Sequence, residues 1–126
     1  MLPAYTCDTV ITPFLEKKWQ CIFYPINKDL TINVDATLNL YKNHNVNLFL
    51  IHPYCGMDLN FHELDLISKL KSNNCKIVID LTQCIFTNQE IPNVDYYVAS
   101  YRKWYQVPDG AYLQSSNIIE LKPLTE

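Results

Sequence analysis

Two short, almost wholly apolar runs most constrain how this chain can fold: "VNLFLIH" at residues 46–52 and "CKIVIDL" at residues 75–81. A strand with one face in water alternates apolar and polar residues, and these runs do not alternate. Such runs are typical of strands that are covered on both faces, as in a parallel sheet. Residues 61–73, which lie between them, repeat apolar residues at helical spacing. The sequence therefore predicts a strand–helix–strand unit with parallel strands.

The rest of the chain extends this pattern. Further strands are predicted at residues 20–26, 94–101 and 111–116. Asp35 is positioned to cap a helix over residues 36–44. Residues 5–15 contain Pro13, which indicates either a short helix with proline in its first turn or the end of a strand. Strands that alternate with helices predict an α/β fold, with a mainly parallel sheet and flanking helices in a single domain.

Charge and composition argue against several classes of protein. The net charge of −3 does not suit a protein that binds nucleic acid or anionic membranes, because such proteins usually carry a basic patch. No apolar run reaches the roughly 18 residues of a membrane-spanning helix, and the N-terminus does not resemble a signal peptide. The five cysteines show no CxxC spacing, which predicts reduced thiols and no metal site. We therefore expect a cytoplasmic protein.

A polar residue closes each of three predicted strands: His52, Asp80 and Ser100. The carboxyl ends of parallel strands share one edge of the sheet, where open α/β sheets bind ligands. The sequence therefore predicts that these side chains meet at that edge. Simpler interpretations stay open for each residue alone. Asp80 also suits a cap or a salt bridge at the end of its strand, and His52 suits a hydrogen-bonded strand-end histidine.

Lys103 stands in an aromatic setting, with Tyr101, Trp104 and Tyr105 around it and Arg102 beside it. A lysine is by default an exposed surface residue. Aromatic neighbours would remove water from its amine, and the charge of Arg102 would further disfavour the ammonium form. We therefore expect Lys103 to be a reactive amine that can form an imine with an aldehyde.

Two further residues stand three positions from these candidates. Ser100 precedes Lys103 by three residues, where its hydroxyl can bind a phosphate oxygen, and Gln83 follows Asp80 by three, where it can reach a ring hydroxyl. A carboxylate for a pyridinium nitrogen, a lysine for an imine and a hydroxyl for a phosphate are the groups that a pyridoxal phosphate site needs. This combination predicts pyridoxal phosphate as the cofactor.

The motifs that carry these residues resemble a known family. "KIVIDLTQ" at 76–83 and "DYYVASYRKWYQVPDGAYL" at 95–113 are similar to the large domain of fold-type I pyridoxal phosphate enzymes, most of all to sugar aminotransferases of the DegT/StrS type. The starting segment "LPAYTCDTV" and the loop "IHPYCGMDLN" resemble that family as well. The resemblance implies that Asp80 pairs with the ring nitrogen, Gln83 contacts the ring oxygen, Ser100 binds the phosphate and Lys103 forms the aldimine.

The same resemblance has consequences for domain organisation and partners. It implies that residues 1–126 form one partial large domain, without the N-terminal phosphate-cup segment and the C-terminal small domain. Its expected substrates are a nucleotide-linked keto sugar and an amino-acid donor, and a homo-oligomer or a partner chain is expected to complete the site. The alternative is a catalytically inactive fragment, or one half of a split enzyme. The sequence departs from the family pattern at Cys7, where a stacking aromatic is usual, and at Ala111, where a second glycine is usual.

Overall fold

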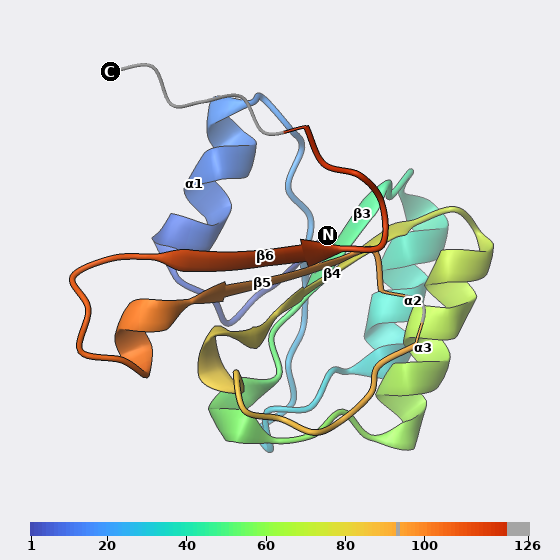
Figure 1. The fold of residues 1–126 in the computed structure, drawn as a ribbon. Helices are drawn as coiled ribbons and strands as arrows, with labels where there is room; N and C mark the ends of the chain where they lie inside the picture. The colour runs from blue at the N-terminus through green and yellow to red at the C-terminus, as the bar shows by residue number, and fades with distance from the viewer. Residues whose placement is uncertain (93, 121–126) are drawn as a thin grey trace.

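The computed structural model describes residues 1–92 and 94–120, which form an α/β fold around a four-stranded sheet (Figure 1). The strands are β3 (Leu48–Ile51), β4 (Lys76–Asp80), β5 (Tyr96–Ser100) and β6 (Ala111–Ser115), in the order β3-β4-β5-β6. β3, β4 and β5 run parallel, and β6 pairs antiparallel with β5. The prediction of a mainly parallel sheet with flanking helices is therefore confirmed.

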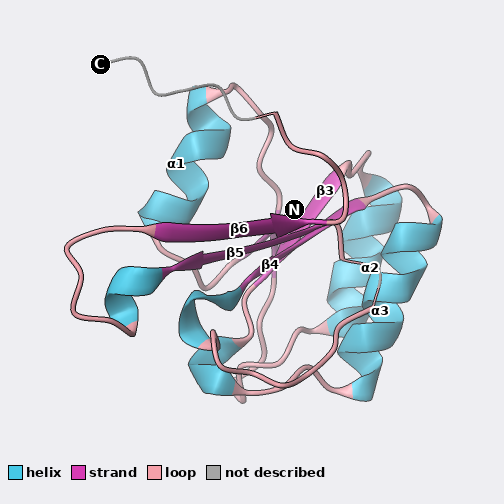
Figure 2. Cartoon of the chain, viewed as in Figure 1, coloured by secondary structure: helices cyan, strands magenta, loops and turns pink. Residues whose placement is uncertain are grey.

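Three α-helices cover the two faces of this sheet (Figure 2). They are α1 (Asp8–Glu16), α2 (Val34–Asn43) and α3 (Phe61–Ser72). Because side chains alternate along a strand, Phe49 of β3 packs in the core with α2 and α3, whereas Leu50 packs with Phe14 of α1. Within residues 1–92 and 94–120, no helix has the length and apolar character needed to cross a membrane.

Two helices begin differently from the prediction. Asn33, not Asp35, caps α2, and its Oδ1 accepts a hydrogen bond of 3.1 Å from the backbone N–H of Ala36. Asp35 instead lies in the first turn, where a carboxylate favours the positive end of the helix dipole. α1 extends through Pro13, which lies beyond its first turn. The expected short helix is therefore confirmed, whereas the first-turn position of Pro13 and the alternative of a strand end are wrong.

The strand predicted over residues 20–26 is mostly absent. Only β2 (Phe23–Tyr24) forms there, and it pairs in parallel with β1 (Leu2–Pro3) rather than with the four-stranded sheet. Prolines within or directly after these strands have no N–H group with which to extend the pairing. The pair still lies against the sheet, because the N–H of Leu50 donates a hydrogen bond of 3.0 Å to the carbonyl of Met1.

A buried glutamate joins α3 to the loop before α2. The side chain of Glu63 is almost fully buried, at 4% exposure. Its Oε1 accepts a 2.7 Å hydrogen bond from the N–H of Ile32, and its Oε2 accepts one of 2.8 Å from the N–H of Asn60. The side chain of Asn60 in turn accepts from the N–H of Glu63, which completes a capping box at the start of α3.

We expect Glu63→Gln to destabilise the fold by about 1–3 kcal/mol, because one acceptor oxygen becomes an NH₂ group that faces a backbone N–H. Urea unfolding followed by circular dichroism measures this change. Glu90→Gln is the matched control, since Glu90 is exposed, and its effect should stay within about 0.5 kcal/mol. Equal effects of the two substitutions would contradict a structural role for the Glu63 carboxylate.

Candidate functional site

A cavity of about 440 Å³ lies at the carboxyl ends of the parallel strands. It is lined by all four predicted site residues, Asp80, Gln83, Ser100 and Lys103, and also by His52. The register of the strands explains why these residues lie together. Asp80 ends β4 and pairs with Val98 of β5, and β5 ends two residues later at Ser100. Both residues therefore lie at the carboxyl-end edge of the sheet. The volume lies within the range of about 300–1,000 Å³ that is typical of small-molecule pockets.

Asp80 is the last residue of β4 and is buried. Its Oδ1 accepts a 2.9 Å hydrogen bond from the N–H of Thr82, so Asp80 does cap the 3₁₀ turn Leu81–Gln83 that follows. Its Oδ2 lies 3.3 Å from Nδ1 of His52. The simpler interpretation of Asp80 as a cap is therefore present, and its other oxygen contacts the imidazole of His52. Each carboxylate oxygen still has a lone pair available for a ligand.

His52 follows β3 and holds its ring between two polar partners. Nε2 lies 2.8 Å from Oγ1 of Thr6, while Nδ1 faces Asp80. Burial lowers the pKa of His52; the carboxylate of Asp80 opposes this effect, and the positive charge of Lys103 adds to it. The imidazole is therefore neutral at pH 7, since its pKa lies below the ordinary value of about 6.5.

The side chain of Gln83 is held by the loop that follows His52. Its Oε1 accepts a hydrogen bond of 3.0 Å from the backbone N–H of Cys55. Cys55 and Gly56 both adopt positive φ angles, of 54° and 75°, which turn this loop toward the cavity. Because the carbonyl oxygen of Gln83 has this partner, its NH₂ group is left to donate to a ligand.

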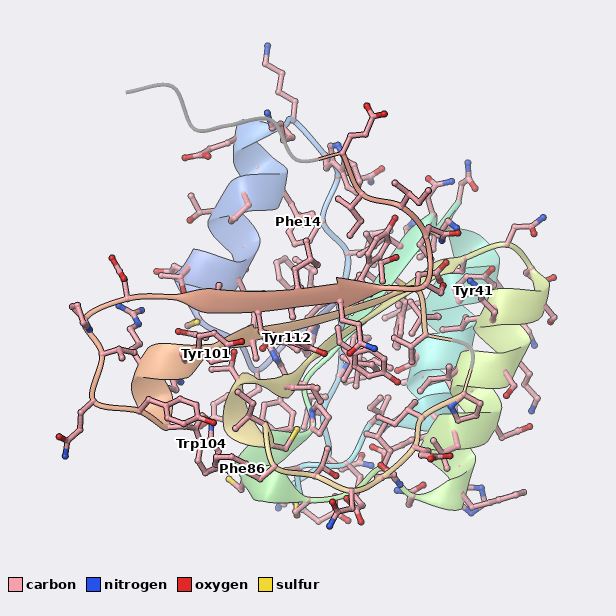
Figure 3. All side chains as sticks on the ribbon, in the orientation of Figure 1. Phe14, Tyr41, Phe86, Tyr101, Trp104 and Tyr112 are labelled. Carbon is pink, nitrogen blue, oxygen red and sulfur yellow. The ribbon has the colours of Figure 1, made fainter. Side chains whose placement is uncertain are left out.

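Ser100 and Lys103 bracket the 3₁₀ turn Tyr101–Lys103, which leads away from β5. Ser100 is anchored through its backbone N–H, which donates to Oγ1 of Thr82 at 3.0 Å. Lys103 is exposed, so the expectation that aromatic neighbours bury it is wrong. Its neighbour Trp104 instead packs edge-on against Phe86 (Figure 3), with ring centroids 5.3 Å apart.

The wall of the cavity opposite β4 and β5 was not predicted. It is formed by the segment that leads into α1, with Thr6, Cys7 and Thr9. A hydrogen bond with Thr9 lowers the pKa of the Cys7 thiol, although partial burial opposes this shift. In the sequence, only the resemblance of "LPAYTCDTV" to the aminotransferase family drew attention to this segment. Its contact with His52 joins residues 46 positions apart, and no local pattern indicates such a contact.

Comparison with known proteins does not identify a relative. No protein-family model matches the sequence, and no curated protein matches it either. All five cysteines are free, and residues 1–92 and 94–120 contain no cluster of three or more His, Cys, Asp or Glu side chains that could hold a metal ion. What the chain does must therefore be inferred from the residues of the cavity and from the motifs that carry them.

Proposed function

We propose that this chain is the cofactor-binding part of a pyridoxal phosphate-dependent aminotransferase of the DegT/StrS type. The amino group would pass from an amino-acid donor to a nucleotide-linked keto sugar. One observation carries the proposal: the four residues that the motifs single out, Asp80, Gln83, Ser100 and Lys103, line one cavity although they come from two separate strand ends. The choice of sugar and donor follows from the motif resemblance alone.

The residues of the cavity fit the chemistry of this cofactor. Pyridoxal phosphate presents a ring nitrogen, a ring hydroxyl, an aldehyde and a phosphate. The cavity offers a buried carboxylate from Asp80, an amide from Gln83 and a primary amine from Lys103. The hydroxyl of Ser100 and the guanidinium of Arg102 line the same cavity and suit a phosphate.

Each side chain has a defined task in this proposal. The cofactor, when bound, supplies an electron sink for bonds at the substrate carbon. Asp80 keeps the ring nitrogen protonated, because a carboxylate close to a protonated nitrogen favours the charged form. Lys103 would hold the aldehyde carbon through its amine until the amino group of the substrate replaces it, and the amine thus freed would remove and return a proton at the substrate carbon. Gln83 donates to the ring oxygen, and Ser100 and Arg102 bind the phosphate.

The test is covalent trapping of the cofactor on Lys103. The purified chain is mixed with pyridoxal phosphate, reduced with borohydride, digested and analysed by mass spectrometry. We expect the reduced adduct on Lys103, and we expect Lys103→Ala to remove it. Lys28→Ala is the control, because Lys28 is an equally exposed lysine in a turn far along the chain from the motifs. Adducts spread over exposed lysines without preference for Lys103 would overturn the proposal.

A second candidate is a chain that needs a partner to complete the site, or that has no activity alone. The exposure of Arg102 and Lys103, which line the cavity, favours it, because the amine of Lys103 remains in water. A second copy or a separate chain that covered this rim would remove that water and favour the reactive amine. In that case trapping on Lys103 should rise steeply with protein concentration, together with the oligomer fraction on a sizing column.

A further inference from the structure

Three polar side chains, those of Thr6, His52 and Asp80, follow one another along the lining of the cavity. Oγ1 of Thr6 lies 2.8 Å from Nε2 of His52, and Nδ1 of His52 lies 3.3 Å from Oδ2 of Asp80. The side chains of His52 and Asp80 are only 9% and 12% exposed. The three residues come from the segment before α1 and from the ends of β3 and β4. The series therefore joins two walls of the cavity.

The chemistry of the groups fixes the direction of the hydrogen bond between Thr6 and His52. An ionised carboxylate can only accept, so the proton between His52 and Asp80 belongs to Nδ1 of His52. A neutral imidazole has a single N–H group, which leaves Nε2 as an acceptor. The hydroxyl of Thr6 must then donate to Nε2. Thr6 therefore supplies a donor to Nε2 of the tautomer that points its N–H toward Asp80.

We propose that Thr6 and His52 are positioning residues that hold the carboxylate of Asp80 in one orientation for the ring nitrogen of the cofactor, an inference that rests on the proposed function. The N–H of Thr82 holds only Oδ1, and the terminal torsion of an aspartate is otherwise soft. Nδ1 of His52 lies 3.3 Å from Oδ2, so each carboxylate oxygen has a polar neighbour that restricts this torsion. Neither Thr6 nor His52 needs to touch the reacting atoms.

The first test uses the cofactor-free protein. Thr6→Val keeps the shape of the side chain but removes the hydroxyl, whereas Thr6→Ser keeps the hydroxyl. In the wild type, ¹⁵N chemical shifts of His52 should report the Nδ1–H tautomer. Thr6→Val should mix the tautomers, because Nε2 of the Nδ1–H form loses the hydroxyl that donates to it. Asp80, Lys103 and the ring of Tyr54 face this imidazole in both variants and act as a constant background.

The second test measures binding of pyridoxal phosphate. Thr6→Val should weaken binding roughly two- to tenfold, and Thr6→Ser should retain wild-type affinity. His52→Asn, whose amide N–H can still donate to Asp80, should retain more affinity than His52→Ala. Thermal unfolding shows that each variant is folded.

The outcomes separate the two proposals. Identical His52 tautomers in Thr6→Val and Thr6→Ser would overturn the positioning role, whatever the cofactor does. Wild-type protein that binds no pyridoxal phosphate would overturn the proposed function, and with it the role of Asp80 toward a ring nitrogen. A tautomer shift combined with equal affinities would show that Thr6 controls the imidazole but not the cofactor, and would also overturn the inference.

Discussion

Asp95→Asn should destabilise the protein by about 2–4 kcal/mol, measured as the free energy of unfolding in urea. The side chain of Asp95 is 3% exposed and accepts hydrogen bonds from three donors. They are Nζ of Lys71, Nζ of Lys76 at 2.9 Å and the buried N–H of Ile77 at 2.9 Å. In asparagine, one of these acceptor oxygens is replaced by an NH₂ group, which cannot accept a hydrogen bond from the lysines or from Ile77. Removing the carboxylate thus leaves buried polar groups without partners.

The same carboxylate makes stability depend on acid. Burial by itself would raise the pKa of Asp95, but the hydrogen bonds from Lys71, Ile77 and Lys76 outweigh it and hold the pKa below its ordinary value. A carboxyl group whose pKa is lower in the folded protein than in the unfolded chain, where it is about 3.9, stabilises the fold. This stabilisation is complete above the pKa of the unfolded chain and is lost as the pH falls through the pKa of the folded protein. Wild-type stability should therefore fall below about pH 4 more steeply than that of Asp95→Asn.

Asp65→Asn provides the matched control for Asp95. Asp65 also pairs with a lysine, since its Oδ2 lies 2.7 Å from Nζ of Lys69 one helical turn away. Both side chains are about half exposed, and exposed pairs of this kind contribute about 0.3–0.5 kcal/mol. Urea midpoints for Asp65→Asn and Asp95→Asn that lie equally close to the wild type would contradict the role given to Asp95.

Asp80→Asn should slow conversion of the bound amino acid roughly 10²-fold or more, in protein loaded with pyridoxal phosphate and any partner that loading requires. An amide cannot hold the ring nitrogen in its protonated form, so the electron sink is lost. Lys103 is unaffected by the change, and borohydride should still trap the cofactor on it. Single-turnover absorbance measures the rate, and mass spectrometry measures the trapping. Chemistry and attachment are thereby separated in one variant.

The control for Asp80 is another carboxylate close to the same strands. Asp109 is exposed and lines a neighbouring hollow with Ser100 and Arg102, outside the cavity that holds Asp80. Asp109→Asn should therefore leave both the rate and the trapping near wild-type values. If Asp80→Asn retained the wild-type rate, Asp80 would be only the cap of the turn that follows β4.

The parts of the fold that were predictable are those with a strong local signal. β3 and β4 are buried on both faces, and an unbroken apolar run records this directly in the sequence. The convergence of His52, Asp80 and Ser100 was also predictable, because the carboxyl ends of parallel strands lie at one edge of the sheet. The antiparallel direction of β6 had no such signal, since its residues are compatible with either direction.

The remaining features depend on contacts between distant parts of the chain. Asn33 and Asp35 are both competent caps, and tertiary packing decides between them, because the start of α2 must bury Thr37 completely. Lys103 is exposed because its aromatic neighbours pack elsewhere, with Trp104 donating to the carbonyl of Thr82 at 2.6 Å. The residues next to a lysine in the sequence do not show which side chains cover it in the folded protein.

The two principal residues of the cavity differ in what the fold itself requires of them. Asp80 stabilises the turn after β4 and binds the ring of His52, so its loss would harm folding as well as any reaction. The side chain of Lys103 makes no hydrogen bond or ion pair within residues 1–92 and 94–120. If selection for activity were lost, Lys103 would be substituted sooner than Asp80, because the fold depends on Asp80 and not on Lys103. Retention of Lys103 in related proteins would therefore indicate a retained activity more clearly than retention of Asp80.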